Sequence, residues 1–146
     1  MSAKSSDERS AVARQAWTLM SDLVLDNGRR RQVSEALGMS FSRSRAIRRI
    51  AHRSLSMGEL AAALGIDPPN ATVLVDDLEA RGLVRRRPHA TDRRAKVVEA
   101  TRAGRALARR ADDILSTPPA GLAALPERDL DALRRILQKA SREQTQ

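Results

Sequence analysis

Residues 56–100, SMGELAAALGIDPPNATVLVDDLEARGLVRRRPHATDRRAKVVEA, decide how this chain folds. Ser56 and Glu59 have the spacing of a capping box, in which each side chain satisfies a free backbone N–H group of the first helical turn. Apolar residues follow at helical spacing, and Gly65 is a residue type at which helices commonly end. The pattern predicts a short helix that stops at Gly65.

A second helix is predicted directly after a short turn. Asp67 is suited to cap it, and Pro68 suits its first turn because a missing N–H group costs nothing there. Gly82 ends this helix after about four turns. Its buried stripe consists of Leu74, Val75 and Leu78. Two helices joined in this way predict a helix-turn-helix.

Two short runs suited to strands follow, at residues 83–87 and 95–100, with a polar tip at residues 88–94. A hairpin in this position is a wing, so the order of elements predicts a winged helix-turn-helix. The fold class is therefore mainly α with a small β-hairpin. Further helices are expected at residues 12–24, 29–37, 42–52 and 101–115 and from Pro126 to about Ala140, with residues 5–9 frayed and interruptions at Asp26-Asn27-Gly28 and at residues 117–121.

Positive charge is concentrated around this wing. Residues 81–110 hold eleven basic and two acidic side chains, a balance of +9 that equals the net charge of the whole chain. Such a local excess suits a polyanion, most plausibly double-stranded DNA. The basic residues from Arg102 onward lie on the following helix, where they extend the positive field without belonging to the hairpin.

Composition limits the class of protein. A chain of 146 residues with 41% apolar content predicts one domain, residues 1–146, and the near absence of aromatic residues favours packed helices. No apolar run approaches about 18 residues, so we expect no membrane partner and a cytoplasmic location. The absence of cysteine excludes disulfides and thiolate metal sites.

Several short motifs together resemble the multiple antibiotic resistance regulator (MarR) family. They are Gly58-Glu59-Leu60-Ala61, Thr72, Leu74-Val75-Asp76, Leu78-Glu79, Gly82-Leu83-Val84, Asp92-Arg93-Arg94 and Thr101-Arg102-Ala103-Gly104. The resemblance spans about residues 56–104. It implies a DNA-binding lobe at residues 42–100 and dimerisation helices at residues 8–37 and 101–143. It also implies a homodimeric repressor of a near-palindromic operator, and lipophilic or aromatic acids that bind between these parts and weaken DNA binding.

The wing holds most of the candidate DNA-binding residues. Asp92 is placed to accept hydrogen bonds from the loop backbone or from Arg94, holding the tip in shape while Arg93 or Arg94 enters a minor groove. About half of the other basic residues should face DNA phosphates, because side chains alternate along a strand. These are Arg85, Arg86, Arg87 and Lys96. The alternative interpretation is a solvated charged turn.

The second helix of the motif is the candidate reader of sequence. Its exposed first residues are Pro69, Asn70, Thr72 and Val73. An Asn amide recognises adenine, whereas Thr offers a hydroxyl and a methyl group. Val73 and Asp77 stand where the family often has Arg or another basic residue, which leaves two alternatives: an A·T-rich operator recognised through thymine methyls and groove shape, or contacts made mainly by the wing. Asn70 could also be an ordinary surface residue.

Other basic residues and the single Trp have weaker functional interpretations. Arg43, Arg45, Arg48, Arg49 and Arg53 could contact phosphates, but a solvated face explains most of them better. Residues 29–31 predict a nearby acidic or anionic partner, because cations are poorly placed at a helix N-terminus. Trp17 is the candidate ligand-binding residue, although a place in the dimer core is the more frequent role of such a residue.

No catalytic or metal-binding constellation is found in the sequence, and no cofactor is implied. His52 and His89 are far apart, and a metal site formed by Asp112-Asp113 with a histidine across a dimer is a weak alternative. Three function classes remain: a ligand-responsive sequence-specific repressor, a sequence-indifferent DNA-coating protein, and an RNA-associated module. The winged-helix order favours DNA over RNA, since a helix fits the B-form major groove and not the A-form one.

Overall fold

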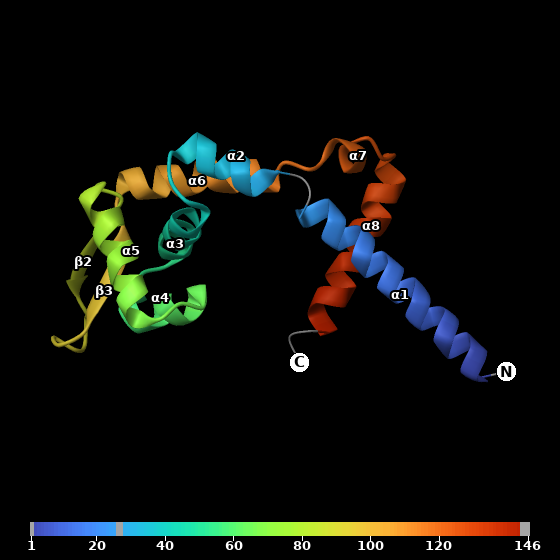
Figure 1. Ribbon diagram of the computed structural model, residues 1–146, viewed down its shortest axis with the longest axis horizontal. Coiled ribbons are helices and arrows are strands. Elements are labelled where there is room, and N and C mark those ends of the chain that lie inside the picture. Colours follow the sequence, from blue (N-terminus) through green and yellow to red (C-terminus); the bar gives the residue numbers. More distant parts are fainter. Residues whose placement is uncertain (1, 26–27, 144–146) are drawn as a thin grey trace. The chain divides into compact units, whose positions relative to one another are not determined.

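The computed structural model describes residues 2–25 and 28–143, which form two compact units. The winged-helix unit is Gly28–Ser116. The helical unit contains the described residues before and after it. Figure 1 shows the order of the elements along the chain.

The winged-helix unit contains the predicted elements in the predicted order, together with one short strand, β1, that was not predicted. They are α2 (Arg29–Leu37), α3 (Phe41–His52), β1 (Leu55–Ser56), α4 (Met57–Leu64), α5 (Pro68–Ala80), β2 (Val84–Pro88), β3 (Lys96–Ala100) and α6 (Arg102–Ser116). The core is aliphatic, as the composition predicts. Its largest fully buried side chains include Ile47, Ile50, Leu60 and Leu78, and α3 supplies the first two of these.

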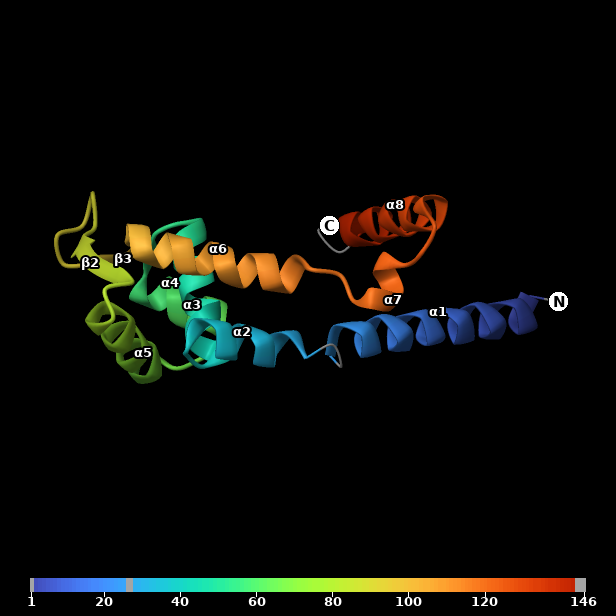
Figure 2. The ribbon, with the colours of Figure 1, turned by 90° about the horizontal axis from the view of Figure 1, so that it is seen from above.

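The predicted hairpin is part of a three-stranded antiparallel sheet with the order β1-β3-β2. Val84 pairs with Ala100 at one end of the hairpin, and Pro88 pairs with Lys96 at the other. The added strand, β1, pairs Leu55 with Val98. The sequence did not predict β1, because two residues are too few to show the alternation that identifies a strand. Figure 2 shows the hairpin extending beyond the helices of this unit.

Local capping sets the helix ends as predicted. The backbone N–H of Glu59 donates to Ser56 Oγ at 3.1 Å, and the Glu59 carboxylate accepts from the Ser56 N–H at 3.2 Å, which completes the capping box. Asp67 accepts the backbone N–H of Asn70 at 2.8 Å and so caps α5. Gly65, between the two helices, has φ +66°, a conformation that costs glycine little.

Helix α6 passes very close to the start of the wing. A Cβ atom added at Gly104 would lie 2.0 Å from the carbonyl oxygen of Leu83, so only glycine fits there. Thr101 Oγ1 donates to the Gly82 carbonyl at 2.7 Å and accepts the Gly104 N–H at 3.1 Å, which confirms its predicted role as the cap of α6. The start of α6 therefore packs directly against the backbone carbonyl groups of Gly82 and Leu83, at the start of the wing.

The winged-helix unit extends beyond the predicted lobe of residues 42–100 on both sides. Helices α2 and α6 lie side by side and both pack on α3 (Figure 1). Val33 and Leu37 of α2 and Ala111 of α6 belong to the same buried cluster as Ile47 of α3. The apolar faces of α2 and α6 are therefore buried within this unit. The role of these two helices in dimerisation stays a prediction.

The helical unit contains α1 (Ser2–Leu25), α7 (Ala120–Ala123) and α8 (Glu127–Glu143). Residues 5–9 are helical, so the prediction of a frayed start was wrong; the helix extends through polar residues that cost it little. Helix α7 was not predicted. Of the predicted interruption Asp26-Asn27-Gly28, the first two residues lie outside the described part of the chain.

Apolar side chains of this unit are largely uncovered. Within residues 5–25 and 117–142, no residue is buried. Trp17 on α1 is 66% exposed, and Ile136 on α8 is 64% exposed. None of the described helices has the length and apolarity required to cross a membrane.

Candidate nucleic-acid interface

Helix α5 presents the predicted sequence-reading residues on its outer surface. Pro69, Asn70, Thr72 and Val73 are all exposed, and Val73 keeps 63% of its surface accessible although its side chain is apolar. The cap at Asp67 and the two prolines of the first turn fix this end of the helix. A rigid, exposed helix end of this kind is the part of a helix-turn-helix that contacts base edges.

Hydrogen bonds within α5 hold two of these side chains. Asn70 Nδ2 donates to Asp67 Oδ2 at 2.8 Å, and Thr72 Oγ1 donates to the Pro68 carbonyl at 3.1 Å. The Asn70 amide oxygen and its second N–H group stay available for an adenine edge. The Thr72 methyl group and Val73 supply an apolar surface beside it.

The acidic residues of α5 are held by arginines from other elements, and no basic residue lies within Pro68–Ala80. Asp77 accepts from Arg43 Nε of α3 at 2.5 Å and from Arg81 Nε at 2.9 Å. The hydrogen bond from Arg43 lowers the pKa of the Asp77 carboxyl below its ordinary value. Asp77, which stands where the family often has a basic residue, anchors α5 to α3 through Arg43, a contact that the sequence did not predict.

Arg86 connects the wing to α5. Its guanidinium donates to Asp76 at 2.5 Å and to Glu79 at 3.0 Å, and its backbone N–H donates to Glu79 at 3.2 Å. Only 20% of its side chain is exposed. A phosphate contact was predicted for this residue; the structure places it in a double ion pair that sets the wing against the helix.

Arg85 and Arg87 share one acidic partner, Glu99 of β3. Arg85 lies directly opposite Glu99 in the sheet and pairs with it, and Arg87 Nε lies 2.7 Å from the other carboxylate oxygen. The hydrogen bond from Arg85 lowers the pKa of Glu99 below its ordinary value. Arg85 and Arg87 thus occupy the face opposite to Arg86, in agreement with the predicted alternation, and both guanidinium groups keep much of their surface exposed.

The wing tip is shaped by Asp92. Its Oδ1 atom accepts the Arg94 backbone N–H at 2.9 Å, which confirms the predicted bond to the loop backbone. His89, not predicted to contribute, also helps, since its Nδ1 atom accepts the Thr91 N–H at 3.2 Å. In the described part of the chain, no side-chain ion pair occupies Arg93, Arg94 or Lys96, and all three are exposed. These cations are therefore free to meet phosphates.

The remaining predicted residues divide between ion pairs and open surface. Of the five arginines at residues 43–53, Arg48 pairs with Asp112 and Arg53 pairs with Glu59, in addition to Arg43 with Asp77. Pairing between helices, and not solvation alone, therefore accounts for three of the five. Arg31 pairs with Glu35 within α2, an acidic partner of the kind predicted. Trp17, the candidate ligand-binding residue, lies exposed on α1.

Comparison with known proteins identifies the class. The model of the MarR family matches residues 37–95, which cover α3 to the wing tip. The predicted resemblance is confirmed, and the chain has the fold of a MarR-family DNA-binding transcriptional regulator.

Similar solved structures come from several organisms. RV1404 from Mycobacterium tuberculosis is 21% identical, covers 94% of this chain and 95% of its own, and superposes with a TM-score of 0.73. The transcriptional regulator BldR from Sulfolobus solfataricus is 25% identical, with 91% and 96% coverage and a TM-score of 0.58. MepR, a transcription regulator of the Staphylococcus aureus multidrug efflux pump MepA, is 18% identical, with 92% and 96% coverage and a TM-score of 0.66.

Proposed function

We propose that this protein is a homodimeric repressor that binds a near-palindromic operator and that a small-molecule effector releases it. The observation that carries the proposal is the combination of one exposed helix end, at Asn70, Thr72 and Val73, with a wing tip whose cations have no acidic side-chain partner among the described residues. One surface offers base contacts and the other offers phosphate contacts, and a sequence-specific DNA-binding protein needs both.

Dimerisation is supported by the uncovered apolar surface of α1 and α8. An apolar groove of about 520 Å³ on the helical unit is lined in part by Leu122, Leu130, Leu133 and Leu137. Exposed apolar surface of this extent on a monomer marks an interaction site. A second copy of the chain is the natural occupant, since two lobes related by a two-fold axis match a near-palindromic operator.

The recognition helix supports an A·T-containing half-site. Guanine is most often recognised by Arg or Lys, and α5 has neither within Pro68–Ala80. Asn70 would pair with adenine, and Thr72 and Val73 would contact thymine methyl groups. The wing would add phosphate and minor-groove contacts through Arg93, Arg94 and Lys96.

The proposed effector would bind close to Trp17. The chain has a single Trp, so its fluorescence reports on that site alone. A ligand that quenches it and also lowers DNA affinity supports this part of the proposal. Quenching without any change in DNA affinity would show that the ligand binds near Trp17 but does not release the protein from DNA.

Selection of bound duplexes from a random pool tests the central claim. We expect an inverted repeat whose half-sites are centred about one helical turn apart. The selected duplex and a scrambled one are then compared by fluorescence anisotropy across a salt series. A ratio of affinities near one at every salt concentration would contradict sequence-specific binding and would favour a DNA-coating protein.

A further inference from the structure

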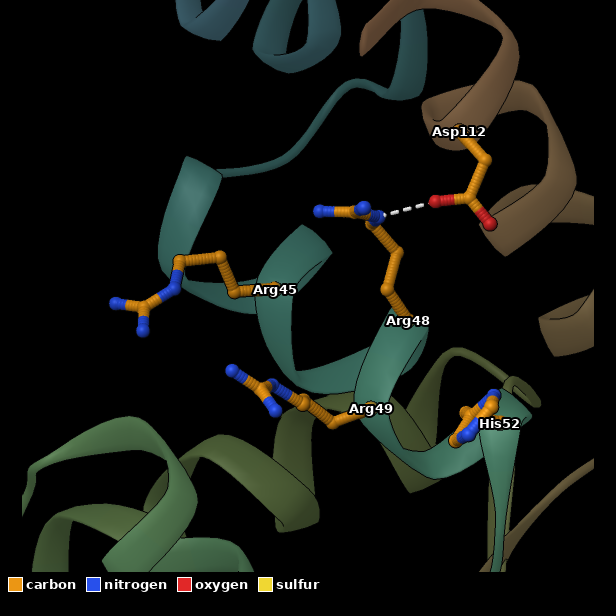
Figure 3. Close-up of a pocket in the computed structure, with 5 residues that line it drawn as sticks. All are labelled: Arg45, Arg48, Arg49, His52 and Asp112. Carbon is orange, nitrogen blue, oxygen red and sulfur yellow. Dashed lines mark hydrogen bonds and ion pairs between the residues drawn. The ribbon is translucent and has the colours of Figure 1, made fainter. Parts of the chain in front are cut away.

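A charged cavity of about 330 Å³ lies against α3 and α6 in the winged-helix unit. Its lining consists of Arg45, Arg48, Arg49 and His52 from α3 and Asp112 from α6 (Figure 3). The volume is at the lower end of the range of about 300–1,000 Å³ seen for small-molecule sites. No residue of α5 or of the wing lines it, so it is separate from the surface proposed to contact DNA.

Four basic side chains share one face of α3, because their positions are three, four and seven residues apart along the helix. Like charges at this spacing destabilise a helix. One carboxylate offsets them: Arg48 Nε donates to Asp112 Oδ1 at 2.5 Å. Three guanidinium groups against one carboxylate leave a charge of +2 when His52 is neutral.

Most of this charge has no partner. Within residues 2–25 and 28–143, no side-chain hydrogen bond or ion pair is formed by Arg45, Arg49 or His52. Figure 3 shows the guanidinium groups of Arg45 and Arg49 extending to the same side of α3, while Arg48 points towards Asp112. Two planar donors are thus free to act together on one ligand.

The lining selects the chemistry of that ligand. A guanidinium group presents paired N–H donors that match two phosphate oxygens. Within the described part of the chain, no apolar side chain lines the cavity to receive the body of a lipophilic acid. A compact anion with at least two charges fits the unpaired arginines best.

We propose that this cavity binds a diphosphate-type polyanion, supplied either as inorganic pyrophosphate or as the diphosphate of a nucleotide. Arg45 and Arg49 bind the polyanion, and Arg48 contacts both the polyanion and Asp112. The site is formed by the winged-helix unit alone and does not depend on the protein being a repressor.

Titration calorimetry of the full chain at constant ionic strength tests the proposal, with pyrophosphate and ADP as separate ligands. We expect Arg45→Gln/Arg49→Gln to weaken pyrophosphate binding by about tenfold or more, since each charge-assisted hydrogen bond is strong. The control Arg102→Gln/Arg110→Gln removes the same charge from exposed positions outside the cavity and should change the affinity by less than about twofold. Tighter binding of ADP than of pyrophosphate would identify a nucleotide as the source, and tighter binding of pyrophosphate than of ADP would identify the inorganic ion.

A second variant keeps the test valid if the double variant fails to fold. Asp112→Asn frees Arg48 and removes the one opposing charge, so pyrophosphate affinity should rise by about threefold or more. A role of Asp112 in helix packing alone would predict no such rise. Circular dichroism confirms the fold of each variant.

Three results would overturn the proposal: absence of pyrophosphate and ADP binding to the unaltered protein, an equal loss of affinity in the exposed control, or unaltered affinity in Arg45→Gln/Arg49→Gln. If that variant instead lost affinity for duplex DNA and kept its affinity for pyrophosphate, the arginines would be DNA contacts. Because the calorimetry contains no DNA, failure of the proposed operator binding would not affect it.

Discussion

Helix α5 and the wing are neighbours in the chain and differ sharply in charge. The helix has Asp76, Asp77 and Glu79 and no basic residue within Pro68–Ala80. The hairpin and its tip have arginines on both faces, including Arg86 and Arg94. The acidic groups of α5 bind arginines of α3 and of the wing, so the two regions neutralise each other where they meet.

This difference separates affinity from specificity. The three consecutive arginines of β2 are held by Asp76, Glu79 and Glu99, whereas the tip keeps its cations without a side-chain partner in the described part of the chain. A dense run of positive charge in the sequence therefore contains both structural and DNA-facing residues. Under the proposed function, the tip supplies sequence-independent attraction and the exposed end of α5 supplies discrimination.

Gly104→Ala should have the largest effect, because it separates the wing from its support. The added Cβ would lie 2.0 Å from the Leu83 carbonyl oxygen, a backbone atom that cannot move aside. We expect a loss of about 3 kcal/mol or more in the free energy of unfolding, which exceeds the gain of about 1 kcal/mol in helix propensity. Urea denaturation measures the difference.

Gly58→Ala is the matched control for this prediction. Nothing lies within 4 Å of a Cβ atom at Gly58, which also belongs to a helix. The control should be neutral or slightly stabilising. Equal destabilisation by both variants would contradict the close approach of α6 to the wing.

Arg94→Ala tests the wing as the source of affinity. In a dimer both tips lose a cation, so we expect binding to weaken by about 3 kcal/mol for selected and scrambled duplexes alike. The salt dependence of the affinity should fall as well. Anisotropy titrations measure both quantities, with Arg110→Ala as an exposed control on α6. A loss confined to the selected duplex would instead make Arg94 a base-reading residue.

Asn70→Ala tests α5 as the source of specificity. We expect a loss of about 1–3 kcal/mol on the selected duplex and little change on the scrambled one. The bond from Asn70 Nδ2 to Asp67 is also lost, so thermal unfolding must show that the fold is retained. Changing the contacted A·T pair should then cost the variant less than the unaltered protein, as a double-mutant cycle measures. Additive losses would exclude a direct contact.

Glu99→Gln should have the smallest effect, visible only in acid. Arg85 lowers the pKa of Glu99 from its ordinary value of 4.5, so the carboxylate contributes stability above about pH 4.5 that is lost as the pH falls through its value in the folded protein. Between pH 7 and pH 3, the unaltered protein should therefore lose more stability than the variant. Urea midpoints across this range measure it, with Glu127→Gln outside the winged-helix unit as control. Identical pH profiles would contradict the ion pair.

Features that depend on neighbouring residues were predictable from the sequence. The capping box at Ser56, the cap at Asp67 and the bond from the Arg94 N–H to Asp92 each join residues two or three positions apart. The same locality makes the helix-turn-helix and its wing recognisable from the order of residues alone. Strand β1 escaped prediction because its evidence is a pairing with β3 more than forty positions away.

The partners of the charged residues were not predictable. Arg43 and Asp77 are 34 positions apart, and Arg48 and Asp112 are 64 positions apart. In the sequence both arginines belong to one basic run with no distinguishing feature. Only the packing of α3 against α5 and α6 gives one of them an anchoring role and the other a place in a charged cavity.

The sequence by itself determined the order of elements, their caps and the position of the net charge, because these follow from backbone hydrogen bonding and from periodicity along a few turns. The tertiary structure decided which charges stay free. An arginine is held or available according to the carboxylate that packing brings within about 4 Å of it, and that proximity depends on chain segments far apart in the sequence.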